Sequence, residues 1–171
     1  MKNSILWILL LIVAAGILWG CTQIPEKPTE PWVEGEAATI TELSFYYADC
    51  TANGWFTYAV RQEDDSVILR VEDFYTGEDG WETQISEPLL EELGKTVGHY
   101  RLEQWDGFQA SNSMILDGSS FSIFIRMADG STVSARGTNA FPENYGAASK
   151  EILAHFREVI AQYKTSDREE P

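Results

Sequence analysis

The chain has 171 residues, 44% hydrophobic and 23% charged, a balance typical of a single globular domain and not of a disordered chain. Its 12 Lys and Arg against 27 Asp and Glu give a net charge of −15. This argues against a nucleic-acid partner, because such binding depends on cations that neutralise phosphates. Two His and two Cys argue against a four-ligand zinc site of these residues and against a disulfide-dense scaffold.

The first residues have the features of a secretion signal. Lys2 precedes an uncharged apolar run over 5–19, shorter than the roughly 20 residues that span a membrane and suited to the core of a signal peptide. The run ends in LWGC, which resembles a bacterial lipobox, where the cysteine is lipidated and becomes the first residue of the mature chain. We therefore predict a signal peptide over 1–20 and lipidation of Cys21. The alternative is an uncleaved anchor with an incidental cysteine.

A tether follows the predicted lipid. Residues 21–36 contain three prolines, and proline-rich segments stay extended, so we expect a semi-rigid linker between the lipid and a domain outside the cytoplasm. With Cys21 lipidated, Cys50 has no partner, and an unpaired cysteine is most often a small buried hydrophobic residue. A Cys21–Cys50 disulfide is the alternative, and it requires that Cys21 carry no lipid.

The globular domain is predicted over 37–164, with a charged tail over 165–171. Alternation of apolar and polar residues predicts strands over 39–49, 55–62, 67–75, 121–127 and 133–137, with a short strand over 81–85.

The register of the last hairpin follows from its apolar residues. A three-residue loop ending at Gly130 pairs Ile125 with Val133. The same register pairs Ile123 with Ala135, which keeps the apolar residues on one face, whereas a two-residue turn would place a charged residue among them. The longer loop needs a left-handed residue at its third position, which Gly130 supplies.

Two segments have helical spacing. In the first, Ser86 is the expected N-cap, Pro88 occupies the first turn and Gly98 is the expected end, with a further turn through His99 and Tyr100 as the alternative. Gly94 weakens the middle of this helix. The second helix covers 147–163, where apolar residues recur three and four positions apart.

These elements predict an α+β fold. Strands that follow one another through short turns favour antiparallel pairing, and their alternation leaves one face of the sheet buried. We expect a single-layer antiparallel sheet of about five or six strands, with two helices packed on one face.

Three segments in the second half of the domain carry a family resemblance. They read WDGF from Trp105, LDGSSFSIFIRMADGSTVSARG from Leu116, and TNAFPENY from Thr138 to Tyr145. Together they resemble small cell-envelope lipoproteins of clostridia and related Gram-positive bacteria. That group has no assigned activity, so the resemblance implies membrane anchoring outside the cell and carries over no catalytic residue.

The segment 139–145 is the first candidate binding region. A long polar and aromatic loop on a rigid scaffold is where binding residues tend to lie, so Asn139, Phe141 and Tyr145 are candidate ligand-binding residues. In the alternative reading, Phe141 and Tyr145 close the edge of the core and Asn144 caps the last helix.

Aromatic residues on outward faces form the second candidate. Phe124, Tyr46 and Phe74 fall on the polar side of their strands, where an aromatic row could stack on a sugar or a peptide. The alternative is that a loop or the tether covers them.

Residues for catalysis form no recognised motif. His99 and His155 are interpreted as surface or boundary residues. Oxygen ligands for Ca²⁺ are offered by the acidic residues around Gly77 and Gly80, namely Asp73, Glu78, Asp79 and Glu82, but their spacing is not that of an EF-hand. We predict no catalytic residue, no metal and no cofactor.

The resulting hypothesis is a lipid-anchored lipoprotein on the extracytoplasmic face of the cell membrane. It is expected to be a non-enzymatic module that binds an envelope protein, a peptide or a glycan, and no nucleic acid. The alternative is an extracytoplasmic hydrolase that depends on carboxylates or calcium. Facing acids of raised pKa in a cleft would favour that enzyme.

Overall fold

The computed structural model describes residues 36–166 except 51, 53, 87 and 116. The predicted signal peptide, Cys21 and all but the last residue of the tether therefore lie outside the described residues. Within the described part, no helix combines the length and the apolar character needed to cross a membrane.

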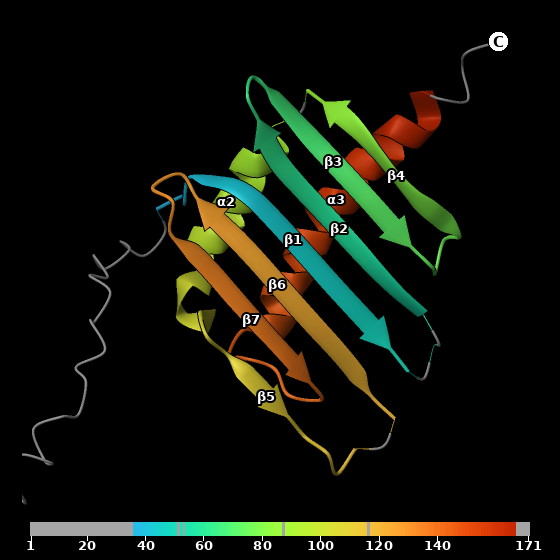
Figure 1. The fold of residues 1–171 in the computed structure, drawn as a ribbon, viewed down its shortest axis with the longest axis vertical. Helices are drawn as coiled ribbons and strands as arrows, with labels where there is room; N and C mark the ends of the chain where they lie inside the picture. Colours follow the sequence, from blue (N-terminus) through green and yellow to red (C-terminus); the bar gives the residue numbers. More distant parts are fainter. Residues whose placement is uncertain (1–35, 51, 53, 87, 116, 167–171) are drawn as a thin grey trace, which may run out of the picture. The chain divides into compact units, whose positions relative to one another are not determined.

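Over these residues, seven strands form one sheet in the order β4-β3-β2-β1-β6-β7-β5 (Figure 1). The strands are β1 (Ile40–Asp49), β2 (Gly54–Glu63), β3 (Ser66–Asp73), β4 (Glu78–Ile85), β5 (Gln109–Ser111), β6 (Ser119–Met127) and β7 (Thr132–Thr138). The first four strands form a meander, and β6 then lies against the free side of β1, which places β1 at the centre of the sheet.

The predicted antiparallel sheet of five or six strands is wrong in strand number and in type. The sheet is mixed, because β5 runs parallel to β7 and pairs Gln109 with Arg136 and Ser111 with Thr138. With three residues, β5 is too short to show an alternating pattern. In the sequence, β6 lies between β5 and its partner β7. Neither local periodicity nor the order of the strands therefore reveals this pair.

The predicted register of the β6–β7 hairpin is confirmed. Ile125 pairs with Val133, and Ile123 pairs with Ala135. Gly130 has a φ of 83°, the left-handed conformation that the third loop position requires.

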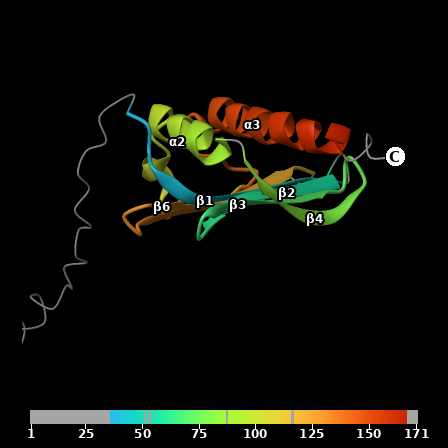
Figure 2. The same cartoon turned by 90° about the horizontal axis from the view of Figure 1, so that it is seen from above.

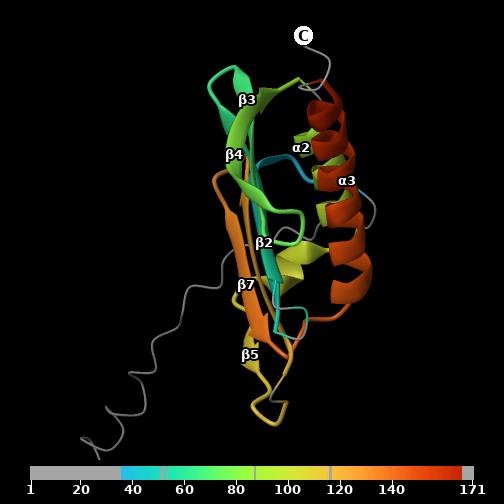
Figure 3. The same cartoon turned by 90° about the vertical axis from the view of Figure 1, so that its right-hand side faces the viewer.

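Two α-helices, α2 (Leu89–His99) and α3 (Tyr145–Ser166), and a 3₁₀ helix η1 (Leu102–Trp105) complete the described fold. Figure 2 and Figure 3 show α2 and α3 on the same face of the sheet. The apolar stripe of α3 is buried there, including Ile152 and Phe156. The expected N-cap at Ser86 is wrong: the cap residue is Pro88, which makes no side-chain cap hydrogen bond.

The glycines of α2 have a packing role that helical propensity does not reveal. A Cβ added at Gly94 would lie 2.1 Å from the carbonyl oxygen of Ala38, and one at Gly98 would lie 2.0 Å from that of Glu36. The N–H of Ala38 donates to the carbonyl of Gly94 at 2.9 Å. The helix continues through Gly98 to His99, in the direction of the alternative extension, and Gly98 lets the segment before β1 pass against it.

Candidate functional site

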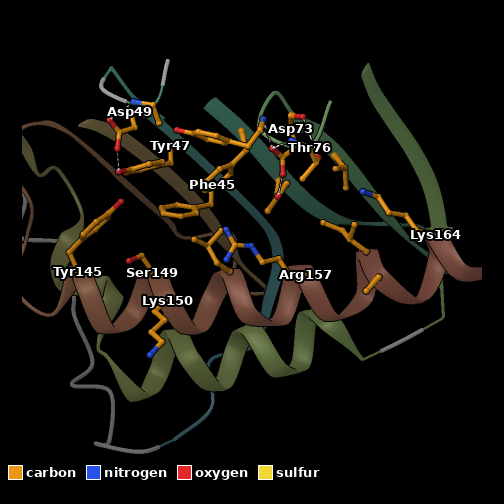
Figure 4. Close-up of a pocket in the computed structure, with 18 residues that line it drawn as sticks. Phe45, Tyr47, Asp49, Asp73, Thr76, Tyr145, Ser149, Lys150, Arg157 and Lys164 are labelled. Carbon is orange, nitrogen blue, oxygen red and sulfur yellow. Dashed lines mark hydrogen bonds between the residues drawn. The ribbon is translucent and has the colours of Figure 1, made fainter. Parts of the chain in front are cut away.

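A cavity of about 830 Å³ lies between α3 and the inner face of strands β1 to β3 (Figure 4). Its floor is aromatic and aliphatic, with Phe45, Phe56 and Val71 from the sheet. Leu153 and Ile160 of α3 form the opposite wall. The cavity lies on the side of α3 away from α2 (Figure 4).

The helix α3 is held at its position by a polar contact with α2. The hydroxyl of Thr96, which is fully buried, lies 3.0 Å from Glu151 Oε1 and 3.2 Å from His155 Nε2. Tyr100 donates its hydroxyl hydrogen to the other oxygen of Glu151 at 3.0 Å. These contacts occupy the α2 side of α3 and leave its other side to line the cavity.

A buried carboxylate marks one part of the cavity. Asp73 is 4% exposed and accepts a hydrogen bond from the Tyr58 hydroxyl. It also accepts hydrogen bonds from the backbone N–H groups of Tyr75 at 2.9 Å and Thr76 at 3.3 Å. Burial and the bond to Asp73 raise the pKa of Tyr58, while the nearby Arg157 opposes that rise in part. Tyr58 therefore remains a hydrogen-bond donor at neutral pH.

A second polar group lies at the N-terminal end of α3. Burial, and then the neighbouring Tyr47, raise the pKa of Tyr145. Tyr47 in turn donates a hydrogen bond to Asp49 Oδ2 at 3.4 Å. Both hydroxyl groups line the cavity, where they offer hydrogen bonds within otherwise apolar walls.

The charged residues that α3 contributes to the lining are all cations: Lys150, Arg157 and Lys164. They follow at intervals of seven residues, about two helical turns, and so lie along one side of α3. Figure 4 shows the side chains of Arg157 and Lys164 directed toward the sheet, and that of Lys150 directed away from it. This cationic wall contrasts with the net charge of −15 of the whole chain.

Among the residues predicted from sequence, Tyr145 lines the cavity. Phe141 packs against it, with ring centroids 4.6 Å apart, and stacks on the buried Phe121 at 5.6 Å. Asn139 has a φ of 54°, and its side chain accepts a hydrogen bond from the N–H of Ser119 at 2.8 Å. The structure thus brings Phe141 and Tyr145 together. It places Asn139 just after β7, where its side chain bonds the backbone of Ser119. Ligand binding by these three residues stays a prediction.

Phe124 lies apart from these residues, on the open face of the sheet. Its neighbours Ile123 and Ile125 are buried beneath the helices, while the guanidinium of Arg126 lies 5.4 Å from the Phe124 ring centroid. Phe74 is 57% exposed and follows the end of β3 in a turn. A binding role for Phe124 also stays a prediction.

Two of the acidic residues considered as calcium ligands, Asp73 and Glu82, lie on opposite faces of the sheet. Asp73 turns into the cavity, whereas Glu82 forms an ion pair with Arg61 at 3.1 Å on the open face. Among the residues that the structure describes, no group of three or more His, Cys, Asp or Glu is placed to hold a metal ion. Cys50, expected to be buried, is exposed, because it falls just beyond the end of β1 and outside the core.

Arg157 and Lys164 are among the cavity residues that the sequence analysis did not single out. The sequence shows them as two cations seven residues apart, but it does not show which side of α3 faces the sheet.

No protein-family model matches the chain, and comparison with curated proteins finds no relative.

Proposed function

We propose that this protein is a lipid-anchored binding protein on the extracytoplasmic face of the cell membrane, and that its cavity holds a small, largely apolar ligand. The cavity is the observation that carries the proposal. Its volume of about 830 Å³ lies within the roughly 300–1,000 Å³ of small-molecule sites. Apolar walls with a few convergent polar groups are also typical of such sites.

The hydrogen bonding of the cavity favours binding over acid–base catalysis. Asp73 accepts three hydrogen bonds from Tyr58, Tyr75 and Thr76, and Asp49 accepts from Tyr47 and from the N–H of Ala52 at 3.3 Å. These bonds hold both carboxylates in place within the wall of the cavity. A wall with fixed polar groups suits recognition of a ligand.

The anchor is tested by metabolic labelling of producing cells with a clickable palmitate analogue. We expect the wild-type chain to be labelled and recovered with membranes, and Cys21→Ala to lose the label. Cys50→Ala is the matched control and should keep it. Equal labelling of Cys21→Ala and wild type would refute lipidation at Cys21.

Ligand binding is tested by mass spectrometry of small molecules that co-purify with the full chain from membranes. Ala161 and Ala154 are both exposed on α3, but Ala161 lines the cavity and Ala154 does not. Ala161→Phe should fill part of the cavity and lose the bound molecule, and Ala154→Phe should retain it. The proposal fails when wild type carries no enriched molecule, or when Ala161→Phe carries as much as Ala154→Phe.

A further inference from the structure

The shape of the cavity indicates an elongated ligand. The residues of α3 that line it run from Tyr145 to Lys164, which corresponds to about 28 Å of helix at 1.5 Å per residue. Beneath this length the sheet presents Phe45, Phe56 and Val71, so that the floor is apolar. A long, narrow apolar body would bury its surface along this floor, which is the main favourable term in such binding.

The charges of the cavity indicate an anionic group on that ligand. Arg157 is exposed and Lys164 half-buried, and both side chains point toward the sheet, so that a bound molecule can reach them (Figure 4). On the opposite wall, Asp73 and Asp49 are engaged by hydroxyl and backbone donors of the chain. The two walls thus differ in chemistry, with anions held by internal donors on one and cations on the other.

Arg157 and Lys164 border the apolar floor of the cavity from the α3 side. A hydrogen bond from a charged donor to a carboxylate or phosphate is roughly twice as strong as one between neutral groups. An anionic group on the ligand would therefore gain more from these two side chains than a neutral group.

We propose that the cavity binds a single-chain anionic amphiphile, whose apolar chain lies between α3 and strands β1 to β3 and whose carboxylate or phosphate contacts Arg157 and Lys164. This inference rests on the proposed function and names its ligand class. A free fatty acid and a lysophospholipid both have this chemistry, and both are compatible with a domain held at a membrane.

The test is photo-crosslinking to the full chain in membrane vesicles. Three probes carry the same diazirine-labelled acyl chain and end in a carboxylate, a phosphate ester or a neutral alcohol. The labelled peptides are mapped by mass spectrometry, and apparent affinity is obtained by titrating each probe. We expect label on cavity-lining peptides of α3 and β1, with an anionic probe binding at least about tenfold more tightly than the alcohol.

The variants separate charge from folding. Arg157→Gln combined with Lys164→Gln should remove the preference for the anionic probes and leave labelling by the alcohol unchanged. Arg157→Lys, which retains the charge, should preserve most of that preference. Arg136→Gln is the matched control, because Arg136 is exposed on the open face and bonds Gln109 at 3.0 Å. Thermal unfolding of each variant verifies that the domain is intact.

The outcomes distinguish this inference from the proposed function. Tighter binding of the carboxylate identifies a fatty acid, and tighter binding of the phosphate identifies a lysophospholipid. Equal binding of all three probes, unaffected by the double substitution, overturns the anionic ligand and leaves a small apolar ligand in place. Absence of label from cavity peptides, or labelling that Ala161→Phe does not reduce, overturns both.

Discussion

At the scale of single residues, Asp73 shows how a buried charge is accommodated. Removal of a carboxylate from water is costly unless hydrogen bonds replace the lost hydration. Asp73 receives such bonds from Tyr58, Tyr75 and Thr76, the last two through backbone N–H groups at the turn after β3. One side chain thereby fixes both the turn and the orientation of Tyr58 in the cavity wall.

Removal of this acceptor should destabilise the domain. Asp73→Ala leaves the buried Tyr58 hydroxyl without its acceptor and should lower the free energy of unfolding by about 2 kcal/mol. Tyr58→Phe removes a single donor, while Asp73 keeps two N–H partners, and should cost about 1 kcal/mol. Urea unfolding of both variants measures the difference. A smaller loss for Asp73→Ala than for Tyr58→Phe would contradict this role.

Two cavity tyrosines, the buried Tyr58 and the half-buried Tyr145, predict a loss of stability in alkali. The pKa of Tyr58 and that of Tyr145 are raised, in both cases mainly by burial. In the unfolded chain a tyrosine ionises near pH 10, while the folded protein still holds both protons. The free energy of unfolding should therefore be unaffected by these groups below about pH 10 and fall as the pH rises above it. Urea unfolding between pH 8 and about 11 tests this.

A double variant provides the comparison for the alkaline loss. Tyr58→Phe with Tyr145→Phe removes both titrating groups, so its stability should fall less steeply above about pH 10 than that of wild type. Parallel curves for the two proteins would show that other groups cause the loss.

At the scale of elements, α2 packs closely against the segment that enters β1. Gly94 lies where its missing side chain leaves room for the carbonyl of Ala38, and this contact carries a backbone hydrogen bond. A glycine within a helix costs up to about 1 kcal/mol relative to alanine. The close approach of the backbones offsets that cost, because the entry to the central strand is held against the helix.

This packing predicts opposite effects for two glycine substitutions. Gly94→Ala should destabilise the domain by about 1–3 kcal/mol, because the added Cβ would meet a backbone oxygen. Gly146→Ala, near the start of α3, meets nothing within 4 Å and should be neutral or slightly stabilising. Thermal unfolding of both variants measures the effects. A stabilised Gly94→Ala would show that the segment before β1 moves aside at little cost.

At the scale of the whole molecule, net charge is the dominant electrostatic property. A charge of −15 on 171 residues produces repulsion within the folded chain, which destabilises the compact state. The ion pairs that oppose this repulsion, such as Arg61 with Glu82, lie on exposed surface and contribute little. Salt screens both the net repulsion and the ion pairs, so the larger of the two decides whether added salt raises or lowers the stability.

Added salt should therefore stabilise the protein. The screening length falls from roughly 30 Å at 0.01 M to about 8 Å at 0.15 M, which reduces the repulsion across the domain. We expect the Tm to rise by about 3 °C over this range, equivalent to about 1 kcal/mol for a chain of this size. Scanning calorimetry with sodium chloride measures the shift. A lower Tm in salt would show that the local ion pairs outweigh the net charge.

Several features of the fold follow from local patterns. Alternation of apolar residues located β1, β2, β3 and β6, because a strand with one buried face must alternate. The register at Gly130 followed because a slip by one residue would have exposed Ile123 and Ile125. The apolar spacing of α3 likewise located the helix and its buried residues.

The candidate site depended on contacts that no local pattern contains. The parallel pairing of β5 with β7 joins segments far apart in the chain, and three residues carry no usable periodicity. In the sequence, Asp73 is one of several acidic residues near a loop, and only the fold places Tyr58 beside it. Composition and periodicity by themselves determined an acidic domain with identifiable strands and helices. Only the tertiary structure decided which side of α3 faces the sheet, and with it the cavity and the cations that border it.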